Sequence, residues 1–248
     1  MEKKKIFIIA EAGINHNGDL LKAYEMVDLA KTCGADAVKF QTFLTENLVT
    51  NNAKTCEYQN KKKKYISQKA MLEKFEIKQE DFLKLKNYTK KRGIEFMSTA
   101  FDLDSLNFLI KKAKVKRIKI ASGDLLNPVL LFNAAISKLP IILSTGMANL
   151  SEIEVALGII SFSSIKKKLP SKIEALSFFK SKEAQKLLKE KVTILQCTTE
   201  YPTSLKNVNL NVISTLKKKF KLSVGLSDHT EDINVAIGSV ALGVSVIE

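Results

Sequence analysis

The sequence predicts a single TIM-type (β/α)8 barrel, because eight short apolar runs recur along its 248 residues and helical patterns separate them. The runs are mostly continuous rather than alternating, as expected for parallel strands that are covered on both faces. Strands that alternate with helices through short connections form a parallel sheet, and eight repeats favour a closed barrel over an open sheet. The expected strands are residues 6–11, 36–42, 94–100, 117–122, 140–145, 192–198, 222–227 and 243–248.

Amphipathic segments between these runs predict the outer helices. Apolar residues recur there at helical spacing, and an Asn or Ser followed three residues later by Glu marks a helix start. Asn149 with Glu152, or Ser151 with Glu154, would form such a capping box. Helices are expected over residues 20–33, 102–113, 207–220 and 231–242, with an additional helix over 181–191.

Two connections are unusually long. Residues 43–78 follow the second strand at the barrel end where active sites are built, so this polar, lysine-rich segment is expected to cover the site. Residues 161–191 lie on the opposite face and are expected to decorate the barrel without taking part in chemistry. The chain reaches only the eighth strand at Glu248, so the expected barrel is truncated and lacks its last helix.

The composition indicates a basic protein with enough apolar residues for a large core. Hydrophobic residues make up 45 %, and 40 basic against 26 acidic residues give a net charge of +14. Most of the excess lies in residues 53–70 and 161–191, where no nucleic-acid recognition motif accompanies it, so we interpret it as solvated surface. No nucleic-acid partner is expected, while the positive field favours an anionic substrate.

No apolar run is long enough to cross a bilayer, and the first one is broken at Glu11, which favours a strand over a signal peptide. Cys33, Cys56 and Cys197 are far apart and form neither a disulfide framework nor a zinc pattern. Cys197, near a strand end, is either a nucleophile or a small core residue. A cytoplasmic protein without a membrane partner is expected.

Two lysines interrupt apolar strands. Lys39 and Gln41 are two residues apart on the second strand and therefore share a face, and Lys119 lies within the fourth strand. A lysine in such a run is costly unless it meets an anion. Three interpretations are open: the lysines hold a phosphate or carboxylate, one of them forms a Schiff base as in aldolases, or each pairs with a core carboxylate such as Glu11.

Hydroxyl side chains end five successive predicted strands. Because the carboxyl ends of barrel strands meet at one edge, these groups and the neighbouring glycines, whose backbone N–H groups are exposed, resemble a cradle for an oxyanion or phosphate. The residues are Ser98-Thr99, Ser122, Ser144-Thr145, Thr198-Thr199 and Ser227, with Gly123 and Gly146 nearby.

The chain has two histidines, and both follow a predicted strand. His229 lies in the stretch Gly225-Leu226-Ser227-Asp228-His229-Thr230, which presents a hydroxyl, a carboxylate and an imidazole at a strand end. His16 lies in Asn15-His16-Asn17-Gly18, a turn signal. Each histidine is either a site residue or a packing and loop residue, and the spacing alone leaves both roles open.

Seven stretches in order resemble the N-acetylneuraminate (sialic acid) synthase family of NeuB-like nonulosonate synthases. They are IIAEAGINHNGD, AVKFQTF, FMSTAFD, KIASGD, IILSTGMANLSEI, QCTTEYPTSLKNVNLN and GLSDHT, and they span essentially the whole chain. The resemblance implies a TIM barrel that condenses phosphoenolpyruvate with an N-acylated hexosamine, either N-acetylmannosamine or a diacetamido-hexose, and releases phosphate. It also implies a divalent metal, Mn²⁺ first with Mg²⁺ or Co²⁺ as alternatives, and a homodimer for the full-length protein.

The resemblance carries over to individual residues. Asp124, Glu11 and His229 match catalytic positions, and His229 matches one of two histidine metal ligands. Glu11, Gln41 and Tyr201 match positions that face the sugar. The positions around phosphoenolpyruvate are matched by Lys39, Thr99, Lys119, Ser122, Ser144, Thr199 and Ser227.

This sequence departs from the family pattern at three places. Asp124 stands where the family usually has Glu, which shortens the reach of the carboxylate that is thought to manage the proton of the attacking water. Thr199 stands where many members have Asn. The second metal-binding histidine and the C-terminal antifreeze-like (SAF) domain would follow Glu248, so residues 1–248 are expected to bind metal weakly. An inactive truncated fragment and a Schiff-base aldolase are therefore the alternatives.

Overall fold

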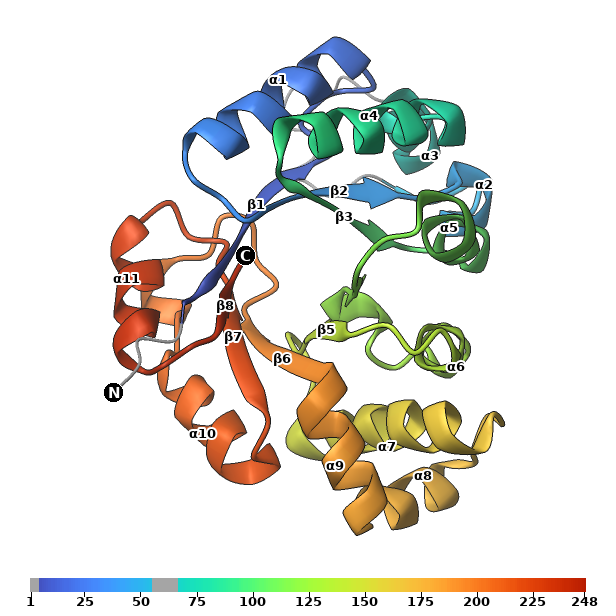
Figure 1. Ribbon diagram of the computed structural model, residues 1–248, viewed down its shortest axis with the longest axis vertical. Coiled ribbons are helices and arrows are strands. Elements are labelled where there is room, and N and C mark those ends of the chain that lie inside the picture. Colours follow the sequence, from blue (N-terminus) through green and yellow to red (C-terminus); the bar gives the residue numbers. More distant parts are fainter. Residues whose placement is uncertain (1–4, 55–66) are drawn as a thin grey trace. The chain divides into compact units, whose positions relative to one another are not determined.

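The fold is a closed parallel barrel with the strand order β1 to β8, which confirms the predicted class. The computed structural model describes residues 5–54 and 67–248 (Figure 1). Each strand falls within three residues of its predicted bounds. The strands are β1 (Phe7–Gly13), β2 (Ala37–Thr42), β3 (Glu95–Ala100), β4 (Ile118–Ile120), β5 (Ile141–Ser144), β6 (Val192–Cys197), β7 (Ser223–Ser227) and β8 (Val246–Ile247).

The helices largely follow the apolar pattern. Asn149 rather than Ser151 forms the capping box, with Glu152 as its partner. The helices are α1 (Leu20–Thr32), α2 (Thr45–Leu48), α3 (Gln68–Phe75), α4 (Gln79–Arg92), α5 (Leu103–Phe108), α6 (Pro128–Ile136), α7 (Leu150–Lys166), α8 (Lys172–Phe179), α9 (Lys182–Lys191), α10 (Asn211–Phe220) and α11 (Ile233–Ala241). A π-helical turn, Leu109–Ala113, continues α5, and short 3₁₀ turns cover Ser122–Asp124 and Leu205–Asn207.

The two long connections carry more helix than the sequence predicted. The described part of residues 43–78 holds α2 and α3. Met71 and Leu72 of α3 form a buried cluster with Phe43, and Leu48 of α2 packs against it. The expectation that this connection covers the site concerns partly residues 55–66, which lie outside the described residues. In the second connection, residues 161–166 belong to α7, and α8 precedes the predicted α9.

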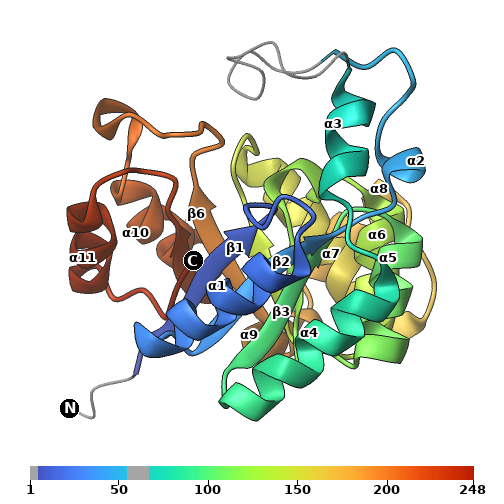
Figure 2. The same cartoon turned by 90° about the horizontal axis from the view of Figure 1, so that it is seen from above.

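Residues 10–115 form one compact unit of the chain. Its strands β2 and β3 pair in parallel, with Lys39 opposite Met97 and Gln41 opposite Thr99. Helices α1 and α4 lie side by side against this pair (Figures 1 and 2). Phe96 stacks on Phe40 and meets Phe82 of α4 in an edge-on contact, so aromatic rings connect the two strands with α4. This register places Lys39 and Gln41 on one face of β2.

Residues 1–9 and 116–248 form the other unit. Strands β4 to β8 follow one another in parallel, and the start of β1 pairs with β8 through Phe7 and Val246. Helices α7, α8 and α9 pack together beside the sheet (Figure 1). In the described ranges, no helix combines the length and the apolar character that a membrane span requires.

The close packing of α7 on α8 depends on Gly158. A Cβ atom at this position would lie 2.3 Å from the Ala175 carbonyl oxygen, whereas a Cβ at Gly238 in α11 would meet only Leu210 Cδ1 at 3.4 Å. Replacing a helical glycine with alanine normally stabilises a protein by about 0.5–1 kcal/mol. We therefore expect Gly158→Ala to destabilise the protein by about 1–3 kcal/mol through overpacking, and Gly238→Ala to stabilise it. Urea unfolding of both variants tests this, and stabilisation by both would contradict it.

Candidate active site

In the unit of residues 10–115, Lys39 is held by an acidic and a hydroxyl side chain. Its side chain is buried and forms an ion pair with Glu11, and its Nζ donates a hydrogen bond to Thr99 Oγ1 at 3.3 Å. Gly13, at φ +54°, leaves room beside Glu11 Oε1 and Gln41 Nε2, which would lie 3.2 and 3.7 Å from an added Cβ. The structure thus brings four predicted residues together, and the pairing of Lys39 with Glu11 matches one of the three interpretations of the strand lysines.

In the unit that contains residues 116–248, Lys119 has a carboxylate partner that was not predicted from the sequence, Glu248. Lys119 Nζ lies 3.0 Å from Glu248 Oε2, and only 5 % and 6 % of the two side chains are exposed. The same oxygen accepts a hydrogen bond from Ser227 Oγ at 2.9 Å. Glu248 closes an apolar run as Glu11 does, and that shared position is the signal that would have found it.

The hydroxyls at the ends of β4, β5 and β6 meet around Gly146. Its N–H donates to Ser122 Oγ at 3.0 Å, and an added Cβ would lie 2.4 Å from Thr199 Oγ1. Ser144 is buried, and its Oγ has no hydrogen-bond partner among the described residues. A buried hydroxyl without a partner costs free energy, and a ligand would remove that cost. The cluster therefore has donors available for an anion.

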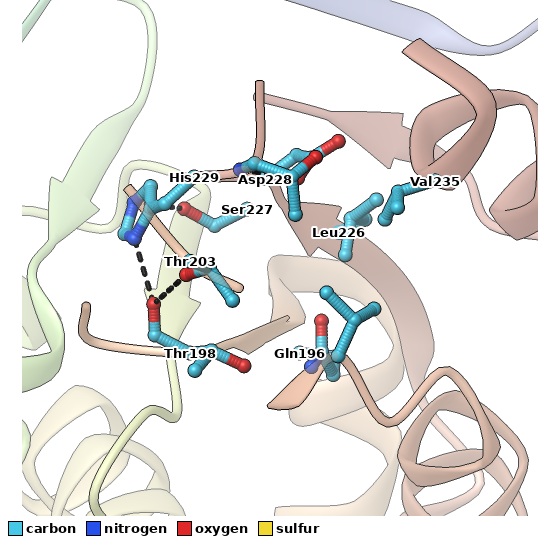
Figure 3. Close-up of a pocket in the computed structure, with 10 residues that line it drawn as sticks. Gln196, Thr198, Thr203, Leu226, Ser227, Asp228, His229 and Val235 are labelled. Atoms are coloured by element: carbon cyan, nitrogen blue, oxygen red, sulfur yellow. Dashed lines mark hydrogen bonds between the residues drawn. The ribbon is translucent and has the colours of Figure 1, made fainter. Parts of the chain in front are cut away.

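The imidazole of His229 lies between the loop after β6 and the end of β7 (Figure 3). Its Nδ1 lies 2.8 Å from the Thr198 carbonyl oxygen, and its Nε2 lies 3.4 Å from Ser227 Oγ. The ring of Tyr201 stacks on the imidazole at a centroid distance of 4.1 Å and an angle of 28°. Burial lowers the pKa of His229, so the ring is neutral at neutral pH. A neutral imidazole has one nitrogen that can act as a ligand.

Asp124 ends the short 3₁₀ turn that follows β4. The Asn127 amide donates to its Oδ1 at a long 3.4 Å. Burial raises the pKa of the Asp124 carboxyl, and the Asn127 hydrogen bond offsets this only in part. A carboxylate with a raised pKa is well suited to accept a proton, because the pKa of a general base is best placed near the working pH.

Comparison with known proteins identifies the family of this chain. Residues 26–248 match the NeuB family. The chain belongs to the NeuB family. It is 43 % identical over 98 % of its length to the N,N'-diacetyllegionaminic acid synthase of Legionella pneumophila and 41 % identical over 99 % to the synthase of the same name from Campylobacter jejuni. These matches cover 62 % and 67 % of the two relatives.

A solved structure of a NeuB-type enzyme supports the fold. The N-acetylneuraminic acid synthetase of Leptospira borgpetersenii, crystallised with citrate, superposes with a TM-score of 0.74 at 34 % identity. The superposition covers 98 % of this chain and 72 % of that one. This NeuB chain spans about three fifths to two thirds of the length of these curated relatives.

The resemblance to the NeuB family implies a divalent metal, and His229 has the geometry of one ligand for it. The Thr198 carbonyl can only accept a hydrogen bond, so Nδ1 of His229 carries the proton and Nε2 keeps its lone pair. Imidazole is a common ligand for divalent transition metals. Within residues 5–54 and 67–248, however, no group of three His, Cys, Asp or Glu side chains is arranged to hold a metal. The free Nε2 of His229 could supply one ligand to such an ion.

His16 is a buried loop residue in this NeuB chain. Its exposed fraction is 0 %, its ring lies beside Phe40, and its Nδ1 accepts the Gly18 N–H at 3.0 Å. Nε2 therefore carries the proton, and it has no partner in the described part of the chain. Burial lowers the pKa of His16 to about 4. These contacts favour the loop and packing role over a role in the site.

Acid should destabilise the protein through His16. Between pH 6.5 and about 4, the unfolded chain binds a proton at His16 that the folded chain does not, so stability falls as the pH falls. The loss reaches about 3 kcal/mol, from 1.36 kcal/mol per pKa unit. We expect His16→Gln to unfold in urea with a shallower dependence on pH over this interval. Equal pH dependence of the variant and the unchanged protein would contradict this assignment.

Proposed function

We propose that this NeuB-family protein is a nonulosonate synthase that condenses phosphoenolpyruvate with an N-acylated hexosamine and releases phosphate. One observation carries the proposal: two buried ammonium groups lie at strand ends that also bear hydroxyls. Lys39 hydrogen-bonds Thr99 Oγ1, and Lys119 shares the Glu248 Oε2 atom with Ser227 Oγ. Phosphoenolpyruvate carries a carboxylate and a phosphate, and such groups need buried cations and hydroxyl or N–H donors.

The proposed reaction joins two carbons and expels one phosphate. C3 of the enolpyruvate attacks the aldehyde carbon of the open-chain sugar, and the aldehyde C=O π bond opens to an oxygen that takes up a proton. The attack leaves C2 electron-poor. Water adds to C2, Asp124 accepts a proton from that water, and phosphate then leaves by cleavage of its C–O bond. A divalent metal at His229 Nε2, Mn²⁺ first, would polarise the sugar aldehyde as a Lewis acid.

Different side chains are proposed to bind the two substrates. Lys39, Thr99 and Lys119 are proposed to hold phosphoenolpyruvate together with the hydroxyl cluster at Ser122, Ser144, Thr199 and Ser227. Glu11, Gln41 and Tyr201 are proposed to face the sugar. Both groups come from strand ends or from the loops directly after them, where barrel enzymes place their catalytic residues.

The acceptor that we propose first is a di-N-acetylated hexose. Both reported curated relatives are named for N,N'-diacetyllegionaminic acid. A nine-carbon product with two acetamido groups requires a six-carbon acceptor that already carries both, because phosphoenolpyruvate supplies three carbons and no nitrogen. N-acetylmannosamine is the alternative acceptor.

The ion pairs argue against a Schiff-base aldolase. A Schiff base forms from a neutral amine, whereas a carboxylate beside the lysine stabilises the ammonium form. Lys39 has Glu11 as such a neighbour and Lys119 has Glu248. Borohydride treatment in the presence of pyruvate should therefore leave the protein mass unchanged.

Phosphate release tests the proposal directly. The protein is incubated with Mn²⁺, phosphoenolpyruvate labelled with ¹⁸O in the bridging position, and either a di-N-acetylated hexose or N-acetylmannosamine, with the Legionella pneumophila relative as a positive control. We expect release that depends on the acceptor, with the label in the phosphate because the C–O bond breaks. Unlabelled phosphate, or release that is indifferent to the sugar, would overturn the proposed reaction.

A further inference from the structure

The two histidines of this protein hold opposite tautomers. His229 donates from Nδ1 to the Thr198 carbonyl oxygen at 2.8 Å, whereas Nδ1 of His16 accepts the Gly18 N–H at 3.0 Å. His229 thus presents a lone pair on Nε2, and His16 presents an N–H there. The hydrogen bond at one ring nitrogen decides what the other nitrogen can bind. A group that fixes the position of the Thr198 carbonyl therefore fixes the tautomer of His229.

Thr203 lies in the same loop as the Thr198 carbonyl and forms hydrogen bonds within it. It lies after the end of β6 with only 5 % of its surface exposed. Its hydroxyl donates to the Glu200 carbonyl oxygen at 2.8 Å and lies 3.3 Å from that of Thr198, and its backbone N–H donates to the His229 carbonyl oxygen at 2.8 Å. Figure 3 shows the resulting chain of contacts from Thr203 through Thr198 to the imidazole. Thr203 thus contacts the acceptor of the His229 hydrogen bond through its hydroxyl and the backbone of His229 through its N–H.

The Glu248 carboxylate prevents the Ser227 hydroxyl from donating to Nε2 of His229. Ser227 Oγ lies 2.9 Å from Glu248 Oε2 and 3.4 Å from His229 Nε2. A carboxylate is a stronger acceptor than a neutral imidazole, and the contact to it is shorter, so the hydroxyl proton goes to Glu248. The backbone holds this carboxylate in place, because Glu248 exchanges hydrogen bonds with Leu226 and Asp228 on either side of Ser227. The lone pair on Nε2 therefore remains available.

We propose that Thr203 is a positioning residue that fixes His229 in the Nδ1–H tautomer and so leaves Nε2 free to bind a divalent cation. The binding of a cation at Nε2 rests on the proposed function, whereas the effect of Thr203 on the His229 tautomer does not. Partners of this kind behind a metal-binding histidine typically change metal affinity about 10- to 100-fold when they are lost.

The tautomers can be read by long-range ¹H–¹⁵N correlation spectra of the metal-free protein, because the chain has only two histidines. His16→Gln assigns the two sets of signals. We expect a protonated Nδ1 for His229 and a protonated Nε2 for His16 in the unchanged protein. A proton on Nε2 of His229 would overturn the inference without any variant, so the test does not depend on a substitution that folds.

Two substitutions at Thr203 separate the hydroxyl from the space it fills. Thr203→Val keeps the volume and removes the hydroxyl, and Thr203→Ser keeps the hydroxyl. We expect Thr203→Val to give a mixture of His229 tautomers and to raise the Kd for Mn²⁺, measured by calorimetry, about 10- to 100-fold. Thr203→Ser should match the unchanged protein, and the His16 signals, which report that the fold is intact, should stay constant.

The tautomer spectra and the Mn²⁺ titration test the role of Thr203 separately from the proposed function. An unchanged His229 tautomer in Thr203→Val sinks the role of Thr203, whatever the activity. If the unchanged protein binds no Mn²⁺ but loses the Nδ1–H tautomer on Thr203→Val, the positioning role stands and the proposed metal at His229 fails. If phosphate release depends on the acceptor sugar but the His229 tautomer is the same in Thr203→Val, the proposed function is supported and the positioning role of Thr203 is wrong.

Discussion

Replacing Asp124 with asparagine is expected to lower phosphate release about 10²- to 10⁴-fold, which is the range for the loss of a general base. An amide has the size of the carboxyl group but cannot accept the proton of the attacking water. Binding of phosphoenolpyruvate should change little, so the loss should appear in kcat rather than in KM. The measurement is phosphate release at saturating and subsaturating phosphoenolpyruvate.

The same substitution is expected to stabilise the fold at neutral pH. Burial raises the pKa of Asp124 above its value in the unfolded chain, so the ionised carboxylate costs stability as the pH rises through the folded pKa. Below the unfolded pKa both states are protonated and the difference from asparagine should vanish. Asp124→Glu is the matched control, because it keeps a carboxylate and restores the length usual in the family. Asp124→Asn with full activity would contradict the assigned role.

Replacing Lys119 with methionine is expected to destabilise the protein by about 3–5 kcal/mol, the cost of breaking a buried ion pair from one side. The Glu248 side chain, only 6 % exposed, would lose the ammonium 3.0 Å away. Lys39→Met is the matched control. Its partner Glu11 is 36 % exposed and can be solvated, so its loss should be nearer 1 kcal/mol.

Urea unfolding compares the two variants, and equal losses would contradict the burial argument. The double variant Lys119→Met/Glu248→Gln should regain much of the stability, because no ionised carboxylate is then buried without its ammonium. It should not regain binding of phosphoenolpyruvate, which isothermal calorimetry can measure. Recovery of binding by the double variant would exclude Lys119 as an anion-binding residue.

The sequence predicted each strand to within three residues because continuous apolar runs with flanking helical patterns are a local signal. It also singled out Lys39 and Lys119, since a charged side chain is conspicuous in a buried strand. The helices in residues 43–54 and 67–78 were missed because α2 has four residues and α3 has eight, too few to show a repeating apolar pattern. They are held by packing around Phe43. Short helices of this kind depend on tertiary contacts rather than on propensity.

The barrel, the family and the residue types at the strand ends could be predicted from local patterns and ordered motifs in the chain. The pairing of these groups is visible only in the folded chain: Lys119 with Glu248, the imidazole of His229 with the Thr198 carbonyl, and His16 with a backbone N–H of its own loop. Hydrogen bonds and ion pairs depend on strand register and loop geometry to within a fraction of an ångström, and residue spacing does not encode that. The roles proposed for the two histidines differ for this reason, although both follow a strand.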